Sequence, residues 1–252
     1  MLSYQELGNG PAVVLIHGFP LAGSIWEQQK QHLAKRYRVI VPDLPGHGAS
    51  AVVPGVSIAQ MGSEVLNLLD HLEIGRAAVA GHSMGGYVAL ALQKQAPERV
   101  TGLGLVATQA GDDTPEAREG RYATAEKVGT QGPEPLVEGL LPKLFASAEG
   151  DSEAKRAVAA LIRQTPREGI QAALHAMAKR EDLRPRLPQI TVPSLVLVGE
   201  EDRLIPPDRS EAMAAQLPTA VLVKVAQAGH MPMLEQPERV SQALERWLDL
   251  IY

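Results

Sequence analysis

The sequence predicts an α/β fold, a mostly parallel β-sheet with helices on both faces and a helical cap inserted late in the chain. Short apolar runs rich in β-branched residues alternate with stretches of helical spacing, which is the pattern of parallel strands joined by crossover helices. The chain has 252 residues, of which 45% are hydrophobic and 21% are charged. A chain of this length and composition can bury the core of one such unit.

The first elements are expected to be strand, strand, helix and strand. Asn9-Gly10 provides a tight turn between an opening strand and the apolar run 12–16. A helix over about 23–35 leads to a strand over 37–42. These runs predict the first strands of the sheet.

The next part of the chain continues the alternation. The residues from Ser57 to Gln60 have the pattern of a capping box, which predicts a helix start, and Gly75 fits just past the end of that helix. The apolar run 77–80 is a strand, the run 86–92 is helical, and 100–106 is a further strand. Strand and helix therefore alternate up to this point.

The strand pattern disappears over residues 112–187, where helical patterns are interrupted by prolines. This segment is expected to form the helical cap, and 1–111 together with 188–252 are expected to form the core. The continuous apolar run 194–198 predicts a buried parallel strand, and 220–225 predicts the last strand.

The motif Gly81-His82-Ser83-Met84-Gly85 lies between an apolar strand and a helical run. A serine in a sharp strand-to-helix turn has a strained backbone, and the flanking glycines let the turn close. Its hydroxyl is then exposed above the sheet, and the first N–H groups of the helix point toward it. The context predicts that Ser83 is a nucleophile.

A serine nucleophile needs a general base, and the best candidate is His230. It lies in a loop after the last expected strand, where this chemistry places the base. The other six of the seven histidines have simpler interpretations, namely solvated helix faces, packing, or Gly-rich turns: His32, His71, His175, His82, His17 and His47.

The acid that orients the base should lie between serine and histidine in chain order. Asp202 follows the strand 194–198 at the point where the chain turns away, and it is preferred to Glu200 and Glu201 because its side chain is shorter. The rival position is the end of the preceding strand, where Asp112 and Asp113 lie.

Backbone N–H groups are expected to form an oxyanion hole. One donor should be Met84, which follows the nucleophile, and the other Phe19, in the loop after the strand 12–16. Pro20 keeps Phe19 extended and has no N–H of its own. The ring of His17 is expected to hold this loop by hydrogen bonding rather than to take part in catalysis.

These motifs resemble those of the α/β-hydrolase family over nearly the whole chain, which implies a sheet of the eight-stranded type and a Ser–Asp–His triad. The resemblance rests on the segments His17 to Pro20, Asp43 to Ser50, Gly81 to Gly86, Gly199 to Asp202 with Pro206, and Gly229-His230. Within the family the chain is similar to small, single-cap serine hydrolases: carboxylesterases, enol-lactone hydrolases and cofactor-free haloperoxidases or perhydrolases. Haloalkane dehalogenases and epoxide hydrolases carry aspartate at the position of Ser83, so their chemistry is not expected here.

Composition excludes several other classes of function. The formal net charge is −5 and Lys and Arg are not clustered, so nucleic acid is not an expected partner. No apolar run approaches the ~18 residues of a membrane span, and the first residues lack the pattern of a secretory signal. The lack of cysteine excludes disulfides and cysteine metal sites and fits a cytoplasmic protein.

The expected function is hydrolysis of small to medium carboxylic esters through an acyl-enzyme, with no metal and no cofactor. Ser83 attacks the carbonyl, His230 transfers the proton, and Asp202 orients the imidazole. The alternatives on the same triad are lactone hydrolysis, carbon–carbon bond hydrolysis and perhydrolysis. A ligand-binding module with a slow, retained triad is an alternative from another class. The sequence leaves the natural substrate and the oligomeric state open.

Overall fold

The centre of the molecule is a seven-stranded sheet with the order β1-β3-β2-β4-β5-β6-β7. The computed structural model describes residues 1–147, 150 and 152–252, and the strand count refers to them. β1 is antiparallel to β3, and all other neighbours are parallel. The sheet is mostly parallel, as predicted, with seven strands in place of the eight-stranded type. The strands are β1 (Tyr4–Leu7), β2 (Ala12–Ile16), β3 (Arg38–Pro42), β4 (Ala77–His82), β5 (Val100–Val106), β6 (Ser194–Gly199) and β7 (Ala220–Val225).

The first strand does not form a hairpin with the second, although a tight turn at Asn9-Gly10 favours that pairing. β1 pairs with β3 along its whole length, so β3 lies between β1 and β2. Gly8 and Gly10 have φ of 82° and 113°. These two left-handed glycines direct the chain past the start of β3, a path that the local turn pattern does not distinguish from a hairpin.

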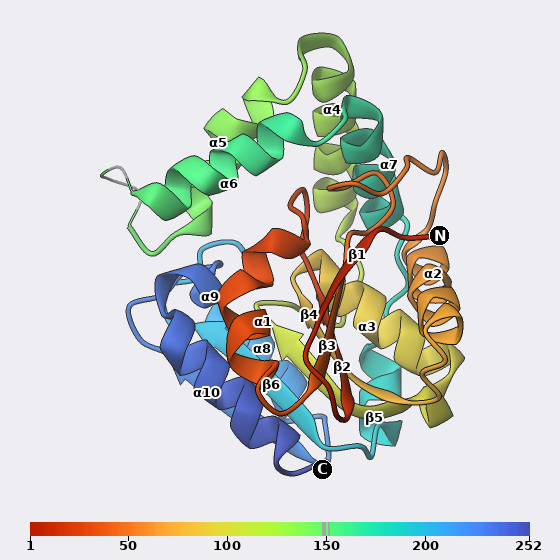
Figure 1. Cartoon of the computed structure of the whole chain (residues 1–252). Helices are drawn as coiled ribbons and strands as arrows, with labels where there is room; N and C mark the ends of the chain where they lie inside the picture. Colours follow the sequence, from red (N-terminus) through yellow and green to blue (C-terminus); the bar gives the residue numbers. More distant parts are fainter. Residues whose placement is uncertain (148–149, 151) are drawn as a thin grey trace.

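Helices cover both faces of the sheet (Figure 1). α1 and α10 pack together on one face, and α2 and α3 pack together on the other. The predicted capping box is present at the start of α2, where Ser57 and Gln60 exchange hydrogen bonds of 2.8 and 3.1 Å. The left-handed residue after α2 is Glu73, with φ 56°, and not the expected Gly75. The flanking helices are α1 (Glu27–Leu33), α2 (Ile58–His71), α3 (Met84–Gln95), α8 (Pro207–Ala214), α9 (Pro232–Glu235) and α10 (Pro237–Leu248).

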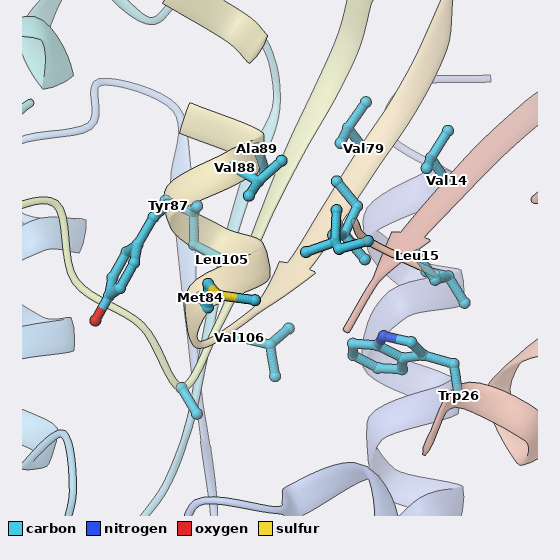
Figure 2. Packing of buried hydrophobic residues seen from close by; sticks show 14 of the residues in the cluster. Val14, Leu15, Trp26, Val79, Met84, Tyr87, Val88, Ala89, Leu105 and Val106 are labelled. Carbon is cyan, nitrogen blue, oxygen red and sulfur yellow. The ribbon is translucent and has the colours of Figure 1, made fainter. Parts of the chain in front are cut away.

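The three central strands form the apolar core that supports the site. Val14 of β2, Val79 of β4 and Leu105 of β5 are all 0% exposed, and Figure 2 shows their side chains beside those of Trp26 and Met84. Full burial of one such aliphatic side chain contributes about 1.5–3 kcal/mol. The core therefore gives the carboxyl ends of these strands a rigid base.

Helices α4–α7, inserted between β5 and β6, lie together above the sheet in Figure 1. α4 packs against α7, and α5 packs against α6. The described residues between β5 and β6 contain no strand, as the sequence pattern predicted. In the described part of the chain no helix has the length and apolar character needed to cross a bilayer. The helices are α4 (Pro115–Gln131), α5 (Glu134–Leu144), α6 (Glu153–Gln164) and α7 (Arg167–Ala178), followed by the 3₁₀ turn η3 (Arg184–Gln189).

The inserted helices are attached to the rest of the chain by buried contacts. The Thr165 hydroxyl donates to the carbonyl of Pro20 at 2.9 Å. A methyl group on Gly169, in α7, would lie 2.1 Å from the carbonyl oxygen of Gly46, so only glycine allows these two backbones to touch. The inserted helices are thereby held against the loops that follow β2 and β3.

Candidate active site

Ser83 occupies a strained turn between β4 and α3. Its φ is 52° and its ψ is −115°, a conformation that costs a residue with a side chain on the order of 1–3 kcal/mol. Two hydrogen bonds hold it: the Ser83 N–H donates to Val106 O at 2.9 Å, and the Thr108 hydroxyl donates to Ser83 O at 2.7 Å. Ser83 is half-buried, so its side chain reaches the surface of the turn.

The glycines around Ser83 are required by close backbone contacts. A methyl group on Gly81 would lie 2.0 Å from Gly85 O, and one on Gly85 would lie 2.5 Å from Ile16 O. At a third glycine, Gly86, an added methyl group would lie 2.5 Å from the Thr108 side chain. The start of α3 therefore packs directly on the end of β2, and the loop after β2 lies beside the serine turn.

Asp202 and His230 form a buried pair. The Nδ1–H of His230 donates to Oδ2 of Asp202 at 2.8 Å. The other carboxylate oxygen accepts the N–H groups of Leu204 and Ile205 at 2.9 and 3.0 Å. Both residues are only 4% exposed. This arrangement fixes the imidazole tautomer and leaves its Nε2 as a proton acceptor.

The rival acids have other partners. Asp113 is ion-paired with Arg121 and with Arg180, the latter at 2.6 Å. Burial of Asp113 opposes its ionisation, but hydrogen bonding to Arg121 and the charges of both arginines lower its pKa. Asp112 lies 3.7 Å from two further arginines, and Glu200 and Glu201 are exposed. Asp202 is the acid hydrogen-bonded to His230.

The loop after β2 is held by His17. Its Nδ1–H donates to Gly18 O at 2.9 Å, and its Nε2 accepts the N–H of Leu44 at 2.9 Å. Burial lowers the pKa of His17 to about 4, so the ring is neutral. The expected hydrogen bonding of the His17 ring within this region is confirmed. Phe19 follows in this loop, and Met84 is the first residue of α3, where N–H groups have no partner within the helix.

Two further residues, His82 and Glu235, contact the loop of His230. The sequence motifs predict this contact for neither of them. The Nε2–H of His82 donates to the backbone carbonyl of His230 at 2.8 Å, and the two rings lie 4.8 Å apart. The Glu235 carboxylate accepts the N–H groups of Ala146 and Gly229 at 2.7 and 2.8 Å, and burial raises its pKa. The signal for His82 was its position within the serine motif, whereas nothing in the sequence singles out Glu235.

The remaining sequence candidates lie as follows. Ser83 follows His82 directly and so lies beside the Asp202–His230 pair, although no hydrogen bond joins the Ser83 hydroxyl to His230 among the interactions of the described residues. His32 pairs with Glu245 at 2.9 Å, and His71 and His175 are exposed, as helix-face residues should be. Within residues 1–147, 150 and 152–252, no group of three or more His, Asp or Glu is arranged to hold a metal.

The buried histidines predict a pH-dependent stability. Burial lowers the pKa of His17 to about 4 and that of His47 to about 3, from 6.5. Between pH 6.5 and 4 the unfolded chain therefore binds more protons than the folded one, and the free energy of unfolding falls as the pH falls. By pH 4 the loss should be about 3 kcal/mol for each of these residues.

Urea unfolding between pH 7 and 4.5 measures this slope. His47→Gln should give a shallower slope, whatever its effect on stability at pH 7, because it removes one group whose pKa differs between the two states. His71→Gln, at an exposed histidine, is the control for the chemical change. A slope that is equal in His47→Gln and the parent protein would contradict the assignment.

Two known proteins match the sequence of the chain over nearly its whole length. It is 33% identical to a pimeloyl-[acyl-carrier protein] methyl ester esterase of Nitrosomonas europaea, covering 93% of this chain and 94% of that protein. It is 30% identical to 3-oxoadipate enol-lactonase 2 of Acinetobacter baylyi, with coverage of 97% and 91%.

Solved structures and the family profile agree with these relatives. A thermophilic esterase from Thermogutta terrifontis superposes with a TM-score of 0.94 at 39% identity, over 99% of this chain and 93% of that one. The profile described as "Alpha/beta hydrolase family" matches residues 13–243. The chain therefore belongs to the alpha/beta hydrolase family.

Proposed function

We propose that this protein is a serine hydrolase that cleaves small to medium carboxylic esters through an acyl-enzyme intermediate. The observation that carries the proposal is the buried Asp202–His230 hydrogen bond of 2.8 Å beside the strained turn of Ser83. The names of the relatives, methyl ester esterase, enol-lactonase and esterase, support ester hydrolysis at the level of the family.

In the proposed first step, Ser83 Oγ attacks the ester carbonyl carbon while Nε2 of His230 accepts the hydroxyl proton. The carboxylate of Asp202 stabilises the imidazolium that forms and keeps Nδ1 as the donor. His230 then gives the proton to the leaving alcohol as the carbon–oxygen bond breaks. The Ser83–His230 hydrogen bond that this step needs forms in the substrate complex, since such bonds are often long in free enzymes.

In the second step, water replaces the alcohol. His230 takes a proton from the water, the resulting hydroxide attacks the acyl carbon, and Ser83 leaves with the proton that His230 returns. No cofactor is needed for either step.

The oxyanion of both tetrahedral intermediates is assigned to the N–H groups of Phe19 and Met84. Met84 begins α3, so its N–H is directed out of the helix end, where the helix dipole also favours negative charge. Contact between Gly85 and the end of β2 supports a second donor from the adjoining loop. Each such donor contributes roughly 3 kcal/mol to the transition state.

We further propose that residues 112–187 act as a cap on a core made of 1–111 and 188–252. The contacts of Thr165 with Pro20 and of Gly169 with Gly46 support a cap that lies over the loops beside Ser83. A cytoplasmic location remains a prediction from the lack of cysteine. The alternative substrate is a lactone, which the enol-lactonase relative favours. A lactone is an internal ester, and the same steps open it.

The assignment of the nucleophile is tested with Ser83→Ala. Because the triad acts as a unit, the variant should lose about six orders of magnitude in kcat on an activated ester. A fluorophosphonate should label Ser83 in the parent protein, as mass spectrometry of the peptides will report. Labelling of another serine, or near-full turnover by Ser83→Ala, would contradict the assignment of Ser83 as the nucleophile.

The acid is tested by comparing Asp202→Asn with Asp113→Asn. The first change should lower kcat by about four orders of magnitude, because an amide at position 202 favours the wrong tautomer of His230. The second is the matched control: it breaks ion pairs to Arg121 and Arg180 and should lower stability without lowering kcat of the folded protein. If Asp113→Asn is the catalytically crippled variant, the acid is assigned to the wrong strand.

The cap predicts a preference for short acyl chains. Each methylene added to the acyl group should gain up to about 0.8 kcal/mol until the covered pocket is full, after which longer chains clash. We expect kcat/KM along a series of p-nitrophenyl esters to reach its maximum between acetate and hexanoate, without activation by lipid droplets. A maximum at long-chain esters would point to an open groove and argue against the cap.

A further inference from the structure

His82 contacts the proposed general base in two ways. Its Nε2–H donates to the backbone carbonyl of His230 at 2.8 Å, across 148 positions of sequence. Its ring centroid lies 4.8 Å from that of His230, with the ring planes at 55°. His82 is 0% exposed, and its peptide adjoins that of Ser83. One side chain therefore links the serine turn to the loop that carries the imidazole.

The remaining ring nitrogen of His82 has no hydrogen-bond partner among the described residues. This Nδ1 is buried, and a methyl group on Gly18 would lie 2.5 Å from it. Because Nε2 faces a carbonyl, it must carry the proton of the neutral ring, and Nδ1 holds a free lone pair. A residue needed for volume alone would not require an imidazole, since an apolar side chain fills this space without an orphaned nitrogen.

The surroundings keep His82 uncharged. Burial lowers its pKa well below the ordinary value, and the neighbouring His230 and His17 lower it further. The titratable groups around this ring are these two histidines and, through His230, Asp202. A neutral His82 can therefore lie against the imidazolium of the reaction without charge repulsion and without competing for the proton.

We propose that His82 is a positioning residue that holds the backbone and ring of His230 in register with Ser83. This inference rests on the proposed function, in which His230 is the base. The donated hydrogen bond fixes the position of the His230 peptide relative to the serine turn and, through this peptide, the position of the imidazole. This constraint acts on the distance that the proton must cross from Ser83 to His230.

Two substitutions separate the hydrogen bond from the ring. His82→Gln keeps an N–H donor the same number of bonds from the backbone and removes the ring. His82→Phe keeps a planar ring of similar size and leaves the His230 carbonyl unpaired. His71→Phe, at an exposed histidine near the end of α2, is the matched control for the chemical change.

His82→Phe should lower kcat by about 10- to 100-fold, the range for loss of one buried hydrogen bond to a backbone carbonyl. Its KM should stay within about twofold, because the displaced group acts in the transition state. His82→Gln should recover kcat to within about threefold of the parent protein. In the free enzymes, NMR should show the Nδ1–H resonance that His230 shares with Asp202 shifted or broadened in His82→Phe and close to the parent position in His82→Gln.

The NMR measurement needs no turnover, so it separates this proposal from the proposed function. If the parent protein hydrolyses no ester, the proposed function fails, and the resonance still decides whether His82 positions His230. The proposal is overturned if His82→Phe keeps both its kcat and its resonance, or if His82→Gln is as impaired as His82→Phe. The second result would show that restoring the hydrogen-bond donor does not restore the position of His230.

Discussion

Ser83 has a backbone conformation that residues with a side chain rarely adopt, φ 52° and ψ −115°, and the site depends on keeping it there. The serine does not stabilise this conformation itself. The fully buried strand β4 and the helix α3 fix the chain on either side, and the Thr108 hydroxyl holds the carbonyl between them. Glycines at 81 and 85 allow the start of α3 to contact the backbones of β4 and β2 closely. The strain is therefore balanced by burial of the sheet, as expected for a pre-organised functional turn.

Four histidines, in the serine turn and in the loops after β2, β3 and β7, are buried, and their environments differ. His47, His17 and His82 each donate to a backbone carbonyl, and burial lowers their pKa values. His230 is the one of the four that donates to a carboxylate, at 2.8 Å. A carboxylate stabilises the protonated ring, whereas a carbonyl in a buried setting does so weakly. The fold thus confines the positive charge of the proposed reaction to His230 and uses the other three rings as fixed, neutral supports.

The inserted helices contact the proposed machinery on two sides. At one side, Thr165 and Gly169 touch the loops after β2 and β3. At the other side, the carbonyl of Leu144 at the end of α5 accepts the N–H of Met231 at 3.1 Å. The Glu235 carboxylate accepts the N–H groups of Ala146 and Gly229. The insertion is therefore attached both to the loop of Phe19 and to the loop of His230.

The sequence by itself determined the α/β class, the place of the helical insertion and the turn of Ser83, because strand runs, proline breaks and flanking glycines act over a few neighbouring residues. It also singled out Asp202 and His230 by their positions after strands, but it left Asp112 and Asp113 as rivals of Asp202. Only the tertiary structure shows that Asp202 is the acid hydrogen-bonded to His230 and that Asp113 is ion-paired with Arg180, since both contacts join residues far apart in the chain. The pairing of β1 with β3 and the contact of His82 with His230 likewise depend on long-range packing, for which a local pattern carries no signal.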